Sequence, residues 1–270
     1  MPGRPSVSPD VRRFAEDPGA WGEIRPESGL TRLLTDRYCL LLGPVPTFTS
    51  VSRLRLAPEE VAETLAEIRD VVATQGHREA AWWVGPSATP ADLVDRLAAH
   101  GLVPATGPSW EPHATALALV DEPPPSPPGI EVRRIATLEE LVLASRLAAE
   151  AFGAPPEEAA GWEEIAEQSF RAEQAGFGPR VYVARVDGEP IAVGRALFAP
   201  DCPAVLMIGG AVLPHARGRG AYRALVRARW DDAVAEGFPA LTTHAGAMSR
   251  PILERLGFQA VAEIEILLDP

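Results

Sequence analysis

A run of five prolines near the middle of the chain constrains its fold more than any other segment. The run lies between Asp121 and Ile130, in the sequence DEPPPSPPGI. Proline lacks an amide hydrogen and fixes its own φ angle, so this stretch cannot join a helix or a central strand. Such a run forms a stiff, extended spacer. We therefore expect two domains, at residues 1–120 and 130–270, joined by a linker at residues 121–129.

The composition of the 270 residues indicates a folded protein and excludes several kinds of chemistry. Hydrophobic residues make up 46% of the chain and charged residues 23%, which is enough to form buried cores. The net charge of −12 argues against nucleic-acid binding, because nucleic-acid phosphates attract basic proteins. The sequence contains no lysine, which excludes a pyridoxal phosphate Schiff base and the lysine-bearing phosphate loop of nucleotide hydrolases. Asparagine is also absent, and the two absences together indicate a GC-rich bacterial genome.

The cysteine content and the hydropathy of the chain indicate its cellular compartment. Cys39 and Cys202 are far apart and have no metal-type spacing, so we expect neither a disulfide framework nor a metal site. The first twenty residues are polar and lack the apolar core of a signal peptide. No apolar run approaches the roughly 18 residues that a membrane span requires. We expect a soluble cytoplasmic protein, monomeric or homodimeric, with no membrane contact.

Residues 130–270 alternate between patterns typical of strands and of helices. The dipeptide Asp187-Gly188 is a strong hairpin signal between two apolar stretches. The expected strands are 131–135, 180–186, 191–198, 204–213, 240–244 and 260–268, and the expected helices are 137–152, 157–171, 221–236 and 249–256. This order predicts a mixed α/β fold with a central antiparallel part.

One segment of the N-terminal half is weakly similar in sequence pattern to a segment of the C-terminal half. Gly76–Leu102 and Gly237–Phe258 both read as a strand, a polar turn, and a helix that ends in Arg-Leu before a glycine. A helical stretch precedes each segment, at 58–74 and at 221–236. An internal repeat is the simplest interpretation, with chance similarity between alanine-rich helices as the alternative. In the first of these strands, we expect Trp82 and Trp83 to lie in a core or an interface.

The segment Val212–Val226, VLPHARGRGAYRALV, is the most informative part of the chain for function. It follows an apolar strand and opens a helix. Gly218 and Gly220 allow a tight turn, and the free amides of the first helical turn form a site for phosphate oxygens. Arg217 and Arg219 add charge-assisted donors for phosphate. A solvated basic turn is the alternative interpretation of an isolated Gly-Arg-Gly.

This loop resembles the pyrophosphate-binding loop of the GCN5-related N-acetyltransferases (GNAT family). The later segment ERLGF, Glu254–Phe258, is similar to that family's closing helix and strand. The resemblance covers about residues 130–270. It implies the acyl-CoA N-acyltransferase fold, a splayed mixed sheet flanked by helices that holds acetyl-CoA in the splay. With a degenerate GNAT-like repeat at residues 1–120, the chain would contain two tandem GNAT-like domains. By this resemblance the cofactor-binding residues are Val212, Leu213, Arg217, Gly218, Arg219, Gly220, Ala221 and Tyr222.

The sequence departs from the family pattern at three places. Tyr222 stands where a small residue is usual, and its ring need not block phosphate because it can turn to the core. Leu253 stands where many members have a tyrosine that protonates the CoA thiolate. The asparagine often found before the last helix is replaced within Gly246–Ser249.

Other residues are therefore candidates for acid and base chemistry. His244 ends a strand that faces the splay and has a suitable ordinary pKa, although a structural histidine is the alternative. Ser249 is a second catalytic candidate, although capping of the last helix would explain it equally. Glu150 and Glu157, together with Glu158, lie where the family admits its acceptor and would attract a cationic amine; a solvated helix face is the alternative. His215 precedes the loop, and exposure to solvent would explain it without a functional role.

The N-terminal half lacks the phosphate loop. Glu59 and Glu60 occupy the matching place, where they suit a helix start but repel pyrophosphate. The resemblance implies an acyltransferase, not an aminoacyltransferase, that moves an acetyl group from acetyl-CoA to an amine of a small molecule or a protein. The alternative is a non-catalytic acyl-CoA-binding sensor or interaction protein of the same fold. No metal cofactor is expected under either interpretation.

Overall fold

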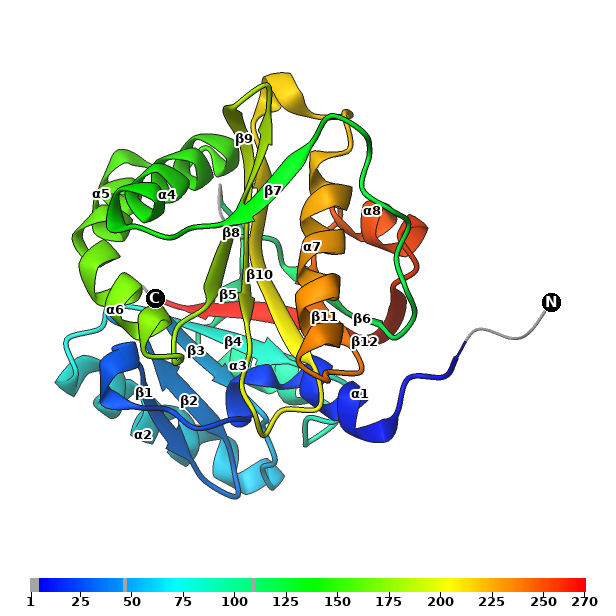
Figure 1. The fold of residues 1–270 in the computed structure, drawn as a ribbon. Helices are drawn as coiled ribbons and strands as arrows, with labels where there is room; N and C mark the ends of the chain where they lie inside the picture. The colour runs from blue at the N-terminus through cyan, green and yellow to red at the C-terminus, as the bar shows by residue number, and fades with distance from the viewer. Residues whose placement is uncertain (1–4, 46–47, 108–109) are drawn as a thin grey trace.

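The computed structural model describes residues 5–45, 48–107 and 110–270. Within these residues, twelve strands form one mixed sheet that helices cover on both faces (Figure 1). The strand order across the sheet is β1-β2-β3-β4-β12-β6-β11-β10-β9-β8-β7, and the short β5 pairs with β12. The mixed α/β class and the splayed sheet expected from the sequence are therefore confirmed.

The first half of the chain supplies the strands at one edge of this sheet and one strand in its interior. Its strands are β1 (Thr31–Leu34), β2 (Cys39–Leu42), β3 (Thr49–Ser52), β4 (Ala80–Val84), β5 (Val103–Pro104) and β6 (His113–Leu119). Its helices are α1 (Pro9–Glu16), α2 (Val61–Thr74) and α3 (Leu93–Ala99), with short 3-10 turns η1 (Pro18–Ala20), η2 (Pro26–Ser28) and η3 (Pro58–Glu60).

The second half follows the order predicted from its sequence pattern. Its strands are β7 (Glu131–Arg134), β8 (Arg180–Val186), β9 (Glu189–Leu197), β10 (Val205–Val212), β11 (Leu241–Ala245) and β12 (Gln259–Asp269). Its helices are α4 (Leu138–Phe152), α5 (Pro156–Glu164), α6 (Ala166–Gln174), α7 (Ala221–Ala235) and α8 (Arg250–Arg255), with the 3-10 turn η4 (Pro214–Ala216). The single helix expected at 157–171 is wrong, because the chain breaks at Ile165 and forms α5 and α6.

Local sequence signals explain several of these boundaries. Asp187 and Gly188 both have positive φ angles, 52° and 86°, as a tight hairpin turn between β8 and β9 requires. The Thr137 side chain accepts a hydrogen bond from the amide of Glu140 and caps α4 at its start. Gly153 ends that helix in the left-handed conformation.

The architecture of the C-terminal half recurs in the N-terminal half. The order β1-β2-β3-α2-β4-α3 repeats as β8-β9-β10-α7-β11-α8. In both halves a parallel contact joins the strands on either side of the long helix, and each contact spans two residue pairs. Ser50 and Val51 of β3 pair with β4, and Val205 and Leu206 of β10 pair with β11. The N-terminal half therefore repeats the architecture of the C-terminal half, as the repeat in the sequence predicted.

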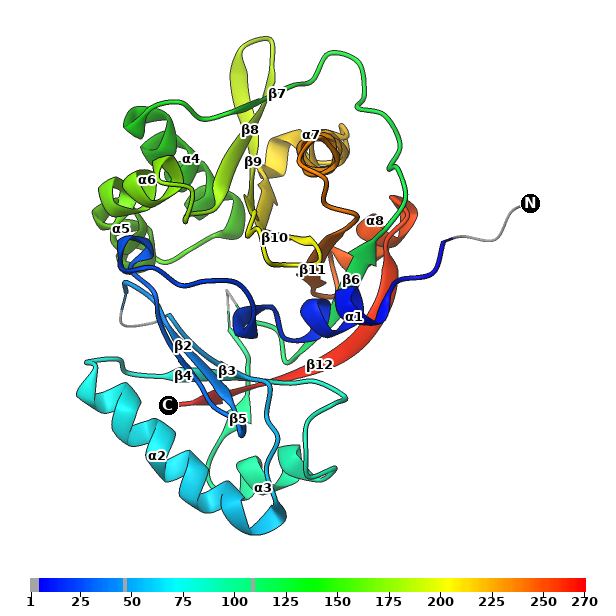
Figure 2. The ribbon, with the colours of Figure 1, turned by 60° about the horizontal axis from the view of Figure 1, so that its bottom comes forward.

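The two halves exchange their last strands. β12 pairs with β4 on one edge and with β6 on the other, and both partners come from before the linker. In turn, β6 pairs with β11 of the second half. Figure 2 shows β12 as a long curved strand that runs from α8 to the sheet of the N-terminal half. The cores follow the strands, since Leu117 and Leu119 of β6 pack in the C-terminal core and Leu267 of β12 packs in the N-terminal core.

The two tryptophans of β4 lie at this junction, as predicted. Trp82 is fully buried in the N-terminal core. Trp83 pairs with Ile266 of β12 in the sheet and stacks on His244 of β11, with ring centroids 5.1 Å apart. The N-terminal half thus contacts β11, the strand that carries the catalytic candidate His244.

None of the helices in the described ranges combines the length and the apolar character needed to cross a bilayer.

An ion pair fixes the end of the exchanged strand, and its removal should destabilise the protein. Arg69 of α2 donates to both carboxylate oxygens of Asp269, at 2.7–3.1 Å, and Asp269 is only 5% exposed. Breaking a buried pair costs about 3–5 kcal/mol, and water screening of the 45%-exposed Arg69 reduces this to about 1–2 kcal/mol. We expect Arg69→Ala to lower the melting temperature by about 2–6 °C.

The control is Arg133→Ala, which removes the exposed Arg133–Glu131 pair on β7. That variant should melt like the wild type, because exposed pairs contribute little. Equal melting temperatures for both variants would show that the end of β12 does not depend on Arg69.

Candidate cofactor and acyl-transfer site

The candidate site lies where β10 and β11 separate. The two strands pair only at Val205–Leu241 and Leu206–Thr242. Directly afterwards, β10 has a bulge against β9 between Ile208 and Ala211. A bulge bends its strand and increases the local twist. The bend turns β10 away from β11 and leaves the rest of its edge without a strand partner.

The unpaired edge of β10 presents backbone groups to the splay. The amide of Leu213 donates to the carbonyl of Ile191 on β9, at 3.0 Å. Backbone polar groups alternate in direction along a strand, so those of Val212 point to the opposite, open edge. Of the two residues expected to contact the cofactor through their backbone, Val212 has the favourable orientation and Leu213 is bonded within the sheet.

The loop between β10 and α7 forms a concentration of free amides. Gly218 and Gly220 have φ angles of 75° and 89°, and Gly220 is the N-cap of α7. In the described part of the chain, the amides of Gly218, Arg219, Gly220 and Ala221 have no protein acceptor. Free amides at the positive end of a fifteen-residue helix favour an anion such as a phosphate.

The arginines of the loop differ in their surroundings. Arg217 turns away from the helix start and donates to the carbonyls of Val212 and Ala151, at 3.3 and 3.2 Å. Arg219 is exposed and, within the described residues, has no hydrogen-bond or carboxylate partner. Arg223, in the first turn of α7, holds a buried Nε without an acceptor. No role for Arg223 was expected from the sequence, although its place in the first helical turn was a usable signal.

The proline-rich linker lies along α7 and ends beside the loop. Arg227 of α7 pairs with Glu122 at 2.6 Å and donates to the carbonyl of Pro123 at 3.3 Å. Further along the linker, the ring of Pro127 lies so close to Gly220 that an added Cβ would be only 2.5 Å from it. Gly220 is therefore required both for its left-handed backbone and for this contact. The linker is an extended strap that borders the cofactor loop.

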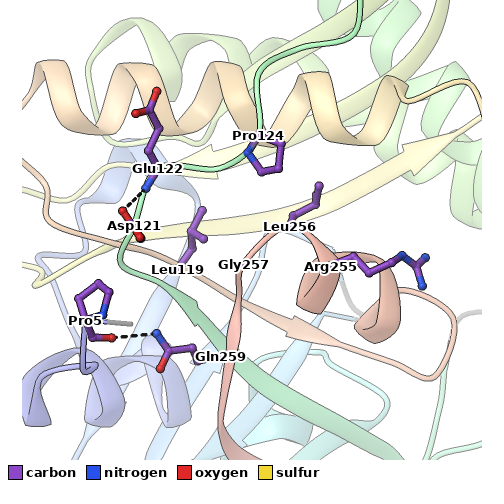
Figure 3. A pocket seen from close by; sticks show the side chains of 9 residues that line it. All are labelled: Pro5, Leu119, Asp121, Glu122, Pro124, Arg255, Leu256, Gly257 and Gln259. Atoms are coloured by element: carbon purple, nitrogen blue, oxygen red, sulfur yellow. Dashed lines mark hydrogen bonds between the residues drawn. The ribbon is translucent and has the colours of Figure 1, made fainter. Parts of the chain in front are cut away.

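A small cavity lies on the other side of the linker. It has a volume of about 220 Å³, and Figure 3 shows linker residues and the end of α8 around it. Its lining residues are Pro5, Leu119, Asp121, Glu122, Pro124, Arg255, Leu256, Gly257 and Gln259. This volume falls below the roughly 300–1,000 Å³ of typical small-molecule sites, so we do not regard it as the site of reaction.

The two bulky departures from the family pattern both point into the core. Tyr222 packs on the C-terminal core and against Gly210 of the β10 bulge, where an added Cβ would lie 2.9 Å from its ring. Its ring thus leaves the phosphate loop open, as predicted. Leu253 is 1% exposed and belongs to the same core. The position where many family members have a tyrosine therefore carries no proton donor in this protein.

His244 lies on the opposite side of the splay from the β10 bulge, with contacts from the N-terminal half. Its Nε2 is 2.8 Å from the carbonyl oxygen of Ala15, which can only accept a hydrogen bond. In the neutral ring the proton is therefore on Nε2, and Nδ1 carries a free electron pair. Desolvation by burial lowers the pKa of His244 below 6.5, although hydrogen bonds to backbone carbonyls oppose this shift. The ring is thus neutral at physiological pH and able to accept a proton.

The turn that follows β11 receives a carboxylate from the other half. Glu111, just before β6, accepts a hydrogen bond from the amide of Ala247 at 2.7 Å and lies against Gly246. Ser249 does not cap α8 through its side chain, which corrects the expected cap; its hydroxyl donates to the carbonyl of Gly246 at 3.4 Å. The sequence offered no signal for Glu111, because only the strand exchange brings it to this turn.

The remaining candidates lie at the surface or belong to the N-terminal half. Glu150, Glu157 and His215 are exposed. In the N-terminal half the turn before α2 lacks glycine, and Glu60 accepts a hydrogen bond from the amide of Ala57 at 2.7 Å. That side chain satisfies an amide at the helix start, and Glu59 adds a second negative charge. The arrangement does not suit a phosphate.

Comparison with known proteins agrees with this geometry. Residues 144–258, which include β8 to β11, the loop and α7, match the family model of the acetyltransferase (GNAT) family. Residues 144–258 are a GNAT domain. No curated protein matches the sequence significantly.

Solved structures extend the similarity in fold to the whole chain. A GCN5-related N-acetyltransferase from Kribbella flavida is 18% identical with a TM-score of 0.69, over 98% of this chain and 97% of that chain. One from Sphaerobacter thermophilus is 16% identical with a TM-score of 0.59, over 88% and 81%. A tandem GNAT protein from the clavulanic acid biosynthesis pathway is 19% identical with a TM-score of 0.57, over 86% and 78%. The C-terminal GNAT domain and its GNAT-like N-terminal partner thus share the fold of tandem GNAT proteins.

The difference between the two helix starts predicts a single cofactor site in each chain. We expect isothermal titration calorimetry of the full chain with acetyl-CoA to give one binding event, because the α7 start has free amides and the α2 start has carboxylates. Glu59→Gln should leave the affinity unchanged. A second event of similar affinity, or a change caused by Glu59→Gln, would place a cofactor in the N-terminal half.

Proposed function

We propose that the C-terminal half transfers an acetyl group from acetyl-CoA to an amine of a small molecule or a protein. One observation carries this proposal: the free amides at the start of α7 lie directly beyond the unpaired edge of β10. The amides suit the pyrophosphate of CoA, and the edge offers the backbone amide of Val212 to the pantetheine arm, since the Val212 carbonyl accepts from Arg217. Arg219 and Arg223, which have no acidic partner among the described residues, supply positive charge beside the loop.

The acyl group of a cofactor held in this way would lie in the splay between the β10 bulge and His244. The acceptor nitrogen attacks the thioester carbonyl, a C–N bond forms, and the C–S bond breaks to release the CoA thiolate. The nitrogen must also lose a proton. In this proposal the free Nδ1 of His244 accepts that proton, while the carbonyl of Ala15 holds the ring in place.

A non-catalytic acyl-CoA-binding protein is the second candidate. The burial of Leu253 favours it, because the residue provides no acid for the departing thiolate. The two functions differ in one measurement, the release of free thiol from acetyl-CoA in the presence of amines. A sensor binds acetyl-CoA without such release.

The phosphate loop can be tested with a change that does not disturb its neighbours. Gly218→Glu adds a negative charge among the free amides, and no atom lies within 4 Å of the new Cβ. We expect the Kd for acetyl-CoA to rise at least about tenfold, since a carboxylate repels the pyrophosphate. Calorimetry on the folded variant measures this.

The matched control is Gly237→Glu, at the far end of α7. Gly237 has a φ of 82°, close to the 75° of Gly218, and its Cβ would also meet no atom within 4 Å. Both variants therefore carry the same backbone strain and the same charge. If Gly237→Glu weakens acetyl-CoA as much as Gly218→Glu does, the loop is not the phosphate site.

His244 should affect turnover more than cofactor binding. His244→Gln can still donate to the carbonyl of Ala15 but cannot accept a proton at neutral pH. We expect thiol release to fall by at least about tenfold, the lower part of the range for general base catalysis, with the Kd for acetyl-CoA within about threefold of wild type. Equal losses in both quantities would mean that His244 only shapes the cofactor cleft.

The pH profile gives an independent check on the same residue. The lowered pKa keeps His244 neutral down to below pH 6.5, so kcat/KM of the wild type should lose activity only below that pH. Protonation would then remove the base. An acid limb centred above pH 6.5 would assign the proton transfer to another group.

A further inference from the structure

Arg195 of β9 lies beside the β10 bulge and faces the splay side of the sheet. Its cross-strand neighbours are Val181 on β8 and Ile208 on β10. Gly194, the residue before it, faces α7, where an added Cβ would lie 3.0 Å from Nη1 of Arg229. Successive residues of a strand point to opposite faces, so the Arg195 side chain lies on the face away from α7.

The same face carries His244 on the other side of the splay. Leu206 and Thr242 form the last pair between β10 and β11, and Ile208 and His244 each lie two residues further along. A period of two keeps the side chains of a strand on one face. Arg195 and His244 therefore lie on the same face of the sheet, with the opening between β10 and β11 between them.

The Arg195 guanidinium has no partner in the described part of the chain, neither a hydrogen-bond acceptor nor a carboxylate. Two other arginines of this part of the sheet have carboxylate partners: Arg180 at the start of β8 pairs with Glu236, and Arg134 of β7 pairs with Glu173 at 3.5 Å. The difference is notable in a chain with 37 acidic and 25 basic residues. A largely desolvated cation without an anion is unfavourable, so an anionic group of a ligand would stabilise it.

The Arg195 side chain is partly buried and lies against the β10 bulge. Desolvation lowers the pKa of its guanidinium, and the residue keeps part of its surface accessible to solvent. Its neighbour Ile208 is 40% exposed. Nη1 lies over Gly209, 3.1 Å from where a Cβ would be, and the φ of Gly209 is 57°. Glycine at this bulge therefore leaves the space that the guanidinium occupies.

We propose that Arg195 binds a carboxylate group of a molecule that reacts in the splay. The carboxylate is carried either by the acceptor, as in an amino acid, or by the acyl chain of the donor, as in succinyl-CoA. A guanidinium donates two parallel hydrogen bonds to a carboxylate, which fixes both position and orientation. Arg195 is thus a specificity-determining residue for the site, and this inference rests on the proposed function.

The test uses the full chain and compares pairs of ligands that differ by one carboxylate group. In the donor arm, calorimetry gives the Kd of succinyl-CoA and of acetyl-CoA. In the acceptor arm, with CoA present at saturation, it gives the Kd of L-phenylalanine and L-leucine and of their amides. We expect the wild type to prefer the carboxylate member in one arm, and Arg195→Gln to weaken that member about tenfold or more while its partner stays within about threefold.

Two variants control for structure. Arg195→Lys keeps the charge but loses the paired donors, so it should retain part of the preference. Arg185→Gln removes an arginine of β8 that bonds only to the carbonyl of Gly188 at the hairpin, and it should change nothing. Melting temperatures confirm that each variant is folded.

The arms also separate the possible outcomes. A loss confined to succinyl-CoA assigns the carboxylate to the donor, and a loss confined to the amino acids assigns it to the acceptor. The inference is wrong if the wild type prefers the carboxylate in neither arm, or if Arg195→Gln weakens both members of a pair equally. The proposed function fails separately, if acetyl-CoA does not bind to the wild type.

Discussion

The open edge at the centre of the candidate site depends on the separation of β10 from β11 after two residue pairs. A fully paired parallel contact would satisfy the backbone of β10 within the sheet and leave no edge for a ligand. The bulge at Gly209 and Gly210 prevents this by bending β10 as soon as the contact ends. Strand separation costs backbone hydrogen bonds that a folded protein would otherwise make. A bound molecule that pairs with the open edge would restore them.

The two ends of the site have different origins. The phosphate end is local, because the strand, the loop and α7 are continuous in sequence and the free amides arise from two left-handed glycines. The reacting end is assembled from distant segments. His244 is held by Ala15 and stacked on Trp83, and Glu111 accepts from the turn after β11. The N-terminal half has carboxylates where a phosphate loop would be. Its contribution to the C-terminal site is therefore to position residues of β11 and of the turn that follows it.

The exchange of last strands explains why the two halves cooperate. β6 and β12 each lie in the sheet beside strands of the other half, and their apolar side chains complete the other core. Neither core is complete without the other half, so the junction is held by buried apolar area and continuous backbone pairing. The proline-rich linker then follows α7 closely, with Arg227 on Glu122 and Pro127 on Gly220. A stiff spacer suits this route because it loses little entropy when it is fixed along a helix.

The sequence by itself determined the local elements and the phosphate end of the site. Hydrophobic periodicity placed the strands and helices of the second half, and Asp187-Gly188 and Gly218–Gly220 marked turns that need positive φ angles. These signals are readable because turn geometry and helix ends depend on neighbours in the chain. Only the tertiary structure decided the strand exchange, the helix break at Ile165, the Glu111 contact and the position of the unpaired Arg195. Each of these depends on packing between residues far apart in sequence, and periodicity carries no information about which strand lies beside which.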